Sequence, residues 1–222
     1  MRAYTPSELR RFLRAVDGAL ARPVEAVVIG GAAAAIEYGV ASGTRDIDTW
    51  TRVTKDLEAA AAQAREATGL PVPLAQSGVA DGPHDLESRL ERVLPRLRRL
   101  KVRVPERHDL VLMKVLRGDE HDLQAIEAIH RHSPLELPVL VARYRDEMGS
   151  TVIEPRRLEA QFLVAIERIF PARVEEVARQ LRPPGVREYG PGRAGGSRPD
   201  TAPETSEAVK ATSNRSRKER SR

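Results

Sequence analysis

A short apolar run that stops at two adjacent glycines is the feature that most constrains the fold. The run is VEAVVIGG, residues 24–31, and it contains several β-branched side chains. A short β-branched segment that ends in glycine is typical of a buried strand. The helix-prone AAAAIEYG follows at once, so the chain is expected to turn from strand to helix at Gly30 and Gly31. This succession predicts an α/β fold.

Recurring apolar residues and capping signals divide the rest of the chain into further short elements. Thr5, Pro6 and Glu8 form a capping box at the start of a helix over 5–20. Alternating apolar and basic residues over 97–105 predict a strand. We expect a further strand over 44–50. Residues 70–75 could form another, which its prolines would place at a sheet edge. Helices are expected over 32–39, 54–69, 106–118, 119–132, 137–149 and 155–181, the last of them broken at Pro171.

The order of these elements predicts three parts. An α/β (α+β) core with a small mixed β-sheet and flanking helices is expected over 1–105, and a helical subdomain over 106–181. Residues 182–222 are rich in Pro, Gly, Ser and Thr, so we expect a disordered tail. The tail holds ten Lys and Arg against five Asp and Glu, which leaves 27 of each sign elsewhere from totals of 37 and 32. The tail therefore carries the whole excess of +5, which could attract a phosphate backbone or only keep the protein soluble.

The composition excludes several classes of protein. The chain has no cysteine, so disulfide bonds and thiolate catalysis are excluded. Its beginning has neither an apolar segment nor a small-residue cleavage site, and no apolar run reaches the roughly 18 residues that a membrane span needs. We therefore expect a cytoplasmic protein without a membrane partner.

Two chemical features follow one another after the first strand. Gly30 and Gly31 let a ligand approach the backbone, and N–H groups at the start of a helix suit a phosphate, although glycine often occupies such turns for steric reasons alone. The triplet Asp46-Ile47-Asp48 then puts two carboxylates on one face of a strand. Such a pair is unfavourable without a cation, and Mg²⁺ is commonly bound by one or two carboxylates together with substrate phosphates. The two features predict one cleft with amides on one wall and acids on the other.

Residues 29–31 (IGG) and 45–49 (RDIDT) resemble the signature of the nucleotidyltransferase superfamily of the DNA-polymerase-β type. The resemblance implies that residues 1–105 form the nucleotidyltransferase-like core and that Asp46 and Asp48 are catalytic ligands of Mg²⁺ or Mn²⁺. Two-metal polymerases of this superfamily place a third carboxylate on a later strand, whereas the polar face of 97–105 offers only basic residues. This difference leaves open whether one or two ions bind and whether the site is active. The residues implied to contact the nucleotide are Gly30, Gly31, Thr44, Arg45 and Arg117.

Residues 109–123 (DLVLMKVLRGDEHDL) resemble a segment of the AbiEii-like group, the minimal nucleotidyltransferases of bacterial toxin–antitoxin and abortive-infection systems. The resemblance implies that Lys114 offsets charge at the α-phosphate or the leaving group, with support from Arg117. It also implies that Asp122 orients the acceptor hydroxyl or accepts its proton. Two alternatives stay open: Lys114 could extend into solvent, and Asp122 could simply lie in the first turn of a helix capped by Asp119.

Together the resemblances imply transfer of a nucleoside monophosphate from an NTP to an acceptor, with a divalent metal ion. The implied acceptor is RNA, in particular a tRNA 3′ end, and the protein would be the toxin of a pair with a cognate antitoxin as its protein partner. Two other hypotheses remain. The chain could be a catalytically degenerate nucleotide- or RNA-binding protein, or it could AMPylate a partner protein.

Overall fold

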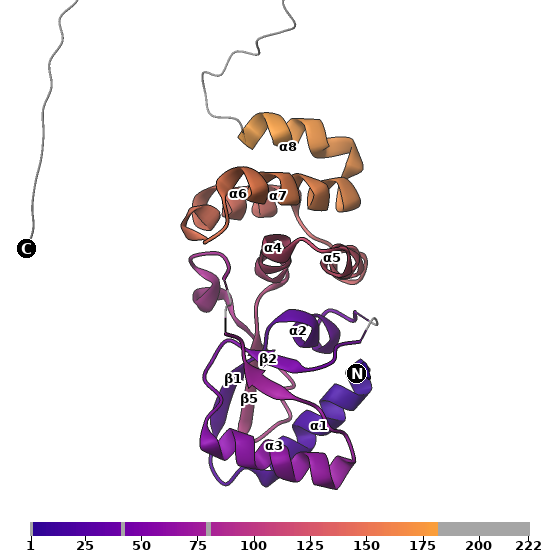
Figure 1. Cartoon of the computed structure of the whole chain (residues 1–222), viewed down its shortest axis with the longest axis vertical. Helices are drawn as coiled ribbons and strands as arrows, with labels where there is room; N and C mark the ends of the chain where they lie inside the picture. Colours follow the sequence, from indigo (N-terminus) through magenta and orange to yellow (C-terminus); the bar gives the residue numbers. More distant parts are fainter. Residues whose placement is uncertain (1, 41–42, 79–80, 182–222) are drawn as a thin grey trace, which may run out of the picture. The chain divides into compact units, whose positions relative to one another are not determined.

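The computed structural model describes residues 2–40, 43–78 and 81–181 (Figure 1). These residues belong to one compact unit, Met1–Pro183. The tail predicted over 182–222 lies outside the described residues. Short strands, flanking helices and a following helical part confirm the predicted α/β class. The division of the chain into two domains at residue 105 stays a prediction.

The described residues form two small sheets from short strands: β1 (Val24–Val27), β2 (Ile47–Thr49), β3 (Leu74–Gln76), β4 (Glu91–Val93) and β5 (Leu100–Val104). In one sheet β5 is central, parallel to β1 and antiparallel to β4. In the other, β2 and β3 are parallel. An antiparallel bridge between Val28 and Thr49 joins the two sheets just beyond β1. This bridge brings β2 next to the turn that follows β1.

Three helices accompany the sheets: α1 (Pro6–Ala19), α2 (Gly30–Ile36) and α3 (Lys55–Thr68). The predicted capping box is present, because the Thr5 side chain accepts from the Glu8 N–H and the Glu8 carboxylate accepts from the Thr5 N–H. α3 begins at Thr54 and ends at the left-handed Gly69, as predicted. α1 and α3 pack against each other along their lengths (Figure 1). The predicted helix over 32–39 begins earlier, at the glycine pair itself.

The helical part contains α4 (Arg107–Arg117), α5 (Glu120–His132), α6 (Leu137–Glu147), α7 (Pro155–Ile169) and α8 (Val174–Leu181). α4 contacts α2, α5, α6 and α7, and Figure 1 shows it between the sheets and α7. Its residues from His108 to Leu116 are all buried, as in a helix at the centre of a core. A 3-10 turn at Pro171–Arg173 separates α7 from α8, which confirms the predicted break. Within the described residues no helix is both long and apolar enough to cross a membrane.

Candidate nucleotidyltransferase site

The turn from β1 into α2 brings Gly30 against the carboxylate of Asp48. The Ile29 N–H donates to the Asp48 carbonyl at 2.9 Å, and the Trp50 N–H donates to the Val27 carbonyl at 2.8 Å. Gly30 has a φ of +65°, which glycine adopts without the strain of a Cβ. A Cβ added there would lie 3.7 Å from Oδ2 of Asp48. The Asp48 carboxylate therefore lies on the side of Gly30 that a side chain would occupy, beside this corner.

Asp46 and Asp48 flank the fully buried Ile47 and are themselves half-buried. Asp46 lies just before β2 rather than within it. Burial raises the pKa of Asp48, the negative charge of Asp46 raises it further, and the positive charge of Arg117 opposes both effects. A divalent cation bound between the two carboxylates would relieve the repulsion that Asp48 experiences from Asp46.

Asp46 and Asp48 could provide only some of the ligands that a metal ion needs. Among residues 2–40, 43–78 and 81–181 there is no group of three or more acidic or histidine side chains that could hold an ion. Asp46 and Asp48 fit a hard cation such as Mg²⁺ by ligand type, but they supply only part of its oxygen ligands. The remaining ligands would have to come from substrate phosphates and water, which is common for Mg²⁺ in phosphoryl-transfer sites.

Thr44 supports both the glycine turn and the acid pair. Its Oγ1 donates to the Asp46 carbonyl at 3.2 Å and lies 3.4 Å from Oδ1 of the same residue. A Cβ added to Gly31 would lie 2.8 Å from that Oγ1, so only glycine fits beside Thr44. The N–H of Tyr4 donates to the Thr44 carbonyl at 2.7 Å and fixes this loop to the start of the chain. The Arg45 side chain, in contrast, is exposed.

A pocket of about 160 Å³ opens beside Gly30 and Asp48. It lies between the β1–α2 corner, α4 and the segment that precedes α7. The polar residues that line it are Asp48, Ser77, Asp81, Lys114 and Arg117. The apolar ones are Ile29, Leu110, Met113, Leu116, Val152 and Ile153. The two resemblances, which lie far apart in the sequence, thus supply side chains to one pocket.

Lys114 and Arg117 are one turn apart on α4 and share the carboxylate of Asp122. Nζ of Lys114 donates to Oδ1 at 2.9 Å, while Arg117 donates through Nε to Oδ2 at 2.8 Å and through Nη2 to Oδ1 at 2.7 Å. The Lys114 and Asp122 side chains are each 1% exposed, whereas that of Arg117 is 54% exposed. The structure therefore rules out the alternative in which Lys114 extends into solvent.

Burial and ion pairing have opposite effects on the pKa values of Lys114 and Asp122. Burial lowers the pKa of Lys114, and the charge of Asp122 opposes that effect. Burial by itself would raise the pKa of Asp122, but the hydrogen bond from Arg117 and the charge of Lys114 lower it overall. The carboxylate of Asp119 accepts from the Asp122 N–H at 2.8 Å, so the expected helix cap is present as well. Asp122 is thus an ionised anchor for two cations.

Asp81 is a pocket residue that the sequence did not single out. Its Oδ1 accepts from the Gly82 N–H at 2.9 Å and its Oδ2 accepts from the Val152 N–H at 3.0 Å. It therefore joins the segment after β3 to the segment before α7, and both segments border the pocket. The only signal in the sequence is the turn-forming DGPHD, which predicts a loop but not its contacts.

The position of the absent third acid can be examined on β5. Arg103 donates through Nη2 to the Leu90 carbonyl at 3.0 Å and lies 3.9 Å from a carboxylate oxygen of Glu25 on the neighbouring β1. β5 therefore presents an arginine where the resemblance would lead one to look for a carboxylate.

Comparison with known proteins agrees with this geometry. Residues 8–172 match the model of a family described as nucleotidyltransferase of unknown function (DUF6036), and the match includes both the β1–α2 corner and the α4–α5 cluster. No curated protein and no solved structure matches the chain significantly. The match supports the predicted assignment to the nucleotidyltransferase superfamily and does not specify the AbiEii-like group. The chain belongs to this family of nucleotidyltransferases.

Proposed function

We propose that the chain transfers a nucleoside monophosphate from an NTP to a hydroxyl group of RNA, with the help of a divalent metal ion. The proposal is carried by one observation. The Asp48 carboxylate lies beside the Gly30 turn, and both line a pocket that Lys114 and Arg117 also line. A ligand in this pocket would meet the Asp48 carboxylate, which suits a cation, and two cationic side chains, which suit phosphate. Asp46 does not line the pocket and is placed in the site by its position two residues before Asp48.

Each group in the pocket has a role that its contacts allow. Asp46 and Asp48 would hold Mg²⁺ or Mn²⁺, which when bound neutralises charge on the triphosphate. Lys114 has three N–H donors and uses one on Asp122, so others can reach a phosphate oxygen. Arg117 uses Nε and one Nη2 donor, and its exposed guanidinium keeps further donors for the phosphate chain. Gly30 and Gly31 would let the triphosphate approach the backbone.

The contacts of Asp122 change the role that we assign to it. In the proposed reaction the acceptor oxygen bonds to the α-phosphorus, the bond from this phosphorus to the β-phosphate oxygen breaks, and pyrophosphate leaves. Both oxygens of Asp122 already accept hydrogen bonds, and its side chain is 1% exposed. We therefore propose that Asp122 positions Lys114 and Arg117 and does not accept the proton of the acceptor hydroxyl. That proton would pass to solvent.

The choice of RNA, and of a tRNA 3′ end in particular, is supported by the resemblance of residues 109–123 to the AbiEii-like group. The same resemblance supports a cytoplasmic toxin with a cognate antitoxin as its partner. The +5 excess charge of residues 182–222 agrees with an anionic acceptor.

The test is label transfer from α-³²P-labelled NTPs to total RNA with Mg²⁺, in the wild type and in Asp46→Asn/Asp48→Asn. We expect labelled RNA with the wild type and a decrease of at least 1,000-fold, on the order of 4 kcal/mol, in the double variant. The matched control is Glu58→Gln/Glu66→Gln, which neutralises two exposed acids on α3 and should keep full activity.

Three other results would each contradict part of the proposal. Transfer that persists in the Asp46/Asp48 variant would refute the role of the acid pair. Label found in protein instead of RNA would indicate an AMPylating enzyme. NTP binding measured by calorimetry without any transfer would indicate a nucleotide-binding protein that has lost catalysis.

A further inference from the structure

A second, larger cavity lies away from the Asp48 pocket, between α1 and the turn that joins β4 to β5. Its volume is about 440 Å³, and it is lined by Arg10, Arg14 and Asp17 from α1 and by Leu94–Leu97 from the turn. Arg10 and Arg14 are four residues apart on the helix and so lie on the same face. Arg96 stands on the opposite wall. We call this cavity the arginine groove.

The turn side of the groove is held in a fixed conformation. The Asp17 carboxylate accepts three backbone hydrogen bonds from the turn, at 3.2 Å from Arg98, 2.6 Å from Arg99 and 2.7 Å from Leu100. Leu94 has a φ of +51°, the one positive value at a non-glycine position among the described residues. Residues kept in this sparsely populated conformation are often found at functional sites. The groove is therefore preorganised rather than formed by loose surface side chains.

The arginines of the groove keep their charge available. Arg10 donates to the Ile36 carbonyl and Arg14 to the Arg10 carbonyl, so both are oriented by neutral groups. In the part of the chain that the structure describes, no ion pair within 4.0 Å involves Arg10, Arg14 or Arg96. Asp17 lines the groove, but its carboxylate is engaged with the turn, and Glu37 interacts electrostatically with Arg10. Arg98 and Arg99 are exposed close by and add to the positive charge.

Three arginines elsewhere in the described residues differ in this respect. Arg89, Arg143 and Arg168 each contact two carboxylates at 3.0 Å or less. Those guanidiniums are neutralised within the fold and serve its stability. The groove arginines form no such ion pairs with carboxylates, so their guanidinium groups are available to bind an external anion.

α2 connects the groove to the Asp48 pocket. Its first residues are Gly30 and Gly31, and its last residue, Ile36, accepts the hydrogen bond from Arg10. A helix of seven residues is about 10 Å long, on the order of three stacked nucleotides at 3.4 Å each. The two sites thus adjoin opposite ends of one helix, and a strand that occupies both would span at least a few nucleotides.

We infer that the arginine groove binds the sugar–phosphate backbone of the RNA acceptor upstream of its reacting 3′ end. The inference rests on the proposed function in taking the acceptor to be RNA. Guanidinium groups bind phosphate oxygens bidentately, and the apolar Leu94 and Pro95 can pack against ribose. The groove would then hold the acceptor, while the pocket beside Asp48 holds the NTP.

The test is binding of a fluorescein-labelled RNA hairpin with a four-nucleotide 3′ overhang to the full chain, measured by fluorescence anisotropy at several KCl concentrations. The variant is Arg14→Glu/Arg96→Glu, which spares Arg10 because of its contact with α2. We expect the Kd at 100 mM KCl to rise at least tenfold. The slope of log K against log salt should flatten by about 1.4, since each lost phosphate contact contributes about 0.7 for a single strand.

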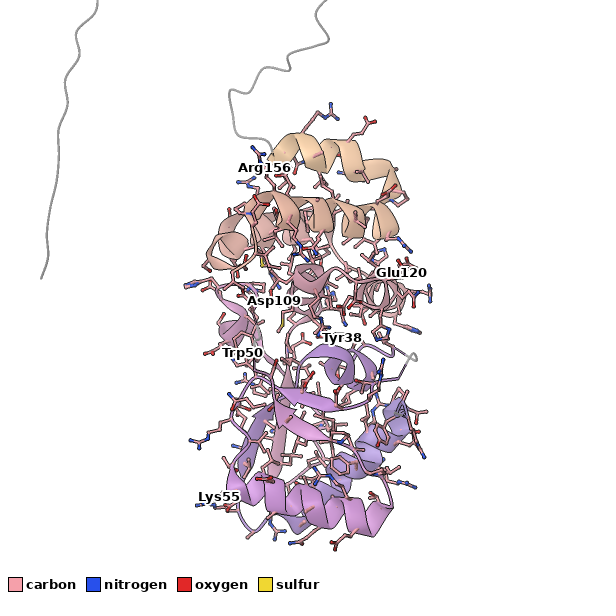
Figure 2. All side chains as sticks on the ribbon, viewed as in Figure 1. Tyr38, Trp50, Lys55, Asp109, Glu120 and Arg156 are labelled. Atoms are coloured by element: carbon pink, nitrogen blue, oxygen red, sulfur yellow. The ribbon has the colours of Figure 1, made fainter. Side chains whose placement is uncertain are left out.

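Two controls separate the groove from overall charge and from misfolding. Arg156→Glu/Arg157→Glu makes the same charge change at exposed positions at the start of α7, where Figure 2 labels Arg156, and should change the Kd less than twofold. Arg14→Lys/Arg96→Lys keeps the positive charges and should stay within about threefold of the wild type. An unaltered melting temperature in each variant excludes unfolding.

Equal RNA affinity in the wild type and Arg14→Glu/Arg96→Glu would overturn the inference, as would equal losses in the two charge-reversal variants. Binding of poly-glutamate with no binding of RNA would overturn it too, in favour of an acidic protein partner. These outcomes are independent of the transfer assay. Selective loss of RNA binding without any NMP transfer would support the groove and refute the proposed reaction. Mg²⁺-dependent transfer to RNA, with RNA affinity unchanged in Arg14→Glu/Arg96→Glu, would support the reaction and refute the groove.

Discussion

Asp48 is the residue at which function and stability are most clearly opposed. Its carboxylate is half-buried beside Asp46, and both burial and this neighbour raise its pKa. A raised pKa in the folded state means that the folded protein binds more protons than the unfolded chain at pH values just above the usual Asp range. Stability contributed by this group is therefore lost as the pH rises through its raised folded-state pKa.

We predict that Asp48→Asn stabilises the metal-free protein. In EDTA at pH 8 the melting temperature should rise by a few degrees at most, since about 1 kcal/mol corresponds to roughly 2–4 °C for a domain of this size. The gain should disappear on acidification, when the wild-type carboxyl is protonated. Added Mg²⁺ should raise the melting temperature of the wild type only. Differential scanning calorimetry measures all three effects, and a lower melting temperature for Asp48→Asn in EDTA would contradict the electrostatic argument.

Asp122 presents the opposite case, a buried acid that the fold requires. Lys114 depends on it for charge compensation at a position that is 1% exposed. Asp122→Asn should reduce the free energy of unfolding by about 3–5 kcal/mol, because an uncompensated buried cation remains. Urea denaturation measures the change. Asp122→Asn/Lys114→Met should recover part of the loss, and Glu120→Gln, which alters an exposed pair in the same first turn, should cost less than about 1 kcal/mol.

At the scale of elements, the β1–α2 corner shows why the two glycines are not equivalent. Gly30 needs a positive φ, whereas Gly31 needs space, because Thr44 occupies the position of its Cβ. The two requirements have different consequences for mutation. Strain at Gly30 is local to its backbone, but a side chain at Gly31 must displace the residue that supports Asp46.

We predict that Gly31→Ala destabilises the protein by about 1–3 kcal/mol, the usual cost of an overpacked site. Adding Thr44→Ala removes the closest atom, Oγ1 at 2.8 Å, and should restore part of the stability. The double-mutant cycle would therefore give a favourable coupling energy of 0.5 kcal/mol or more. Additive effects in urea denaturation would show that Thr44 is not the obstacle.

Several elements could be predicted from local signals. The capping box at Thr5 and Glu8, the cap at Thr54 and the stop at Gly69 are all confirmed, because each depends on residues within a few positions of one another. β4 was not predicted, since three residues with two charges carry no strand pattern. It becomes a strand only because β5 offers it an antiparallel partner. The expected strand over 44–50 is shortened to β2, since its pairing partners are β3 and the end of β1.

At the scale of the molecule, a buried ionic network ties the helical part together. Asp109 on α4 is fully buried and accepts from Arg89 and from Arg143, and Arg89 also contacts Glu147 at the end of α6. Figure 2 labels Asp109 on α4, between the sheets and α7. Three charged groups from two other segments thus join the network at Asp109, and α4 also carries Lys114 and Arg117 into the pocket. The network therefore holds in place the helix that completes the site.

The compact unit Met1–Pro183 contains this network and a continuous hydrophobic core. We predict that a chain truncated after Pro183 unfolds in one cooperative transition, with a melting temperature within about 2 °C of the full chain. Calorimetry of both forms at equal concentration checks this. A broadened transition, or a larger decrease in melting temperature, would show that residues 184–222 contribute to the stability of the unit.

The sequence by itself determined the class of fold, the caps and breaks of the helices, and the residue types of the candidate site. These follow from local periodicity, from glycine and proline, and from the pairing of Asp46 with Asp48, all of which act over a few residues. Only the tertiary structure decided that Lys114 is buried and forms an ion pair with Asp122. Only it decided, too, that Asp81 and Val152 line the same pocket as Gly30. It also decided that Arg10, Arg14 and Arg96 share a groove. Burial and charge pairing depend on which distant segments pack together, and that information is not contained in any short stretch of the chain.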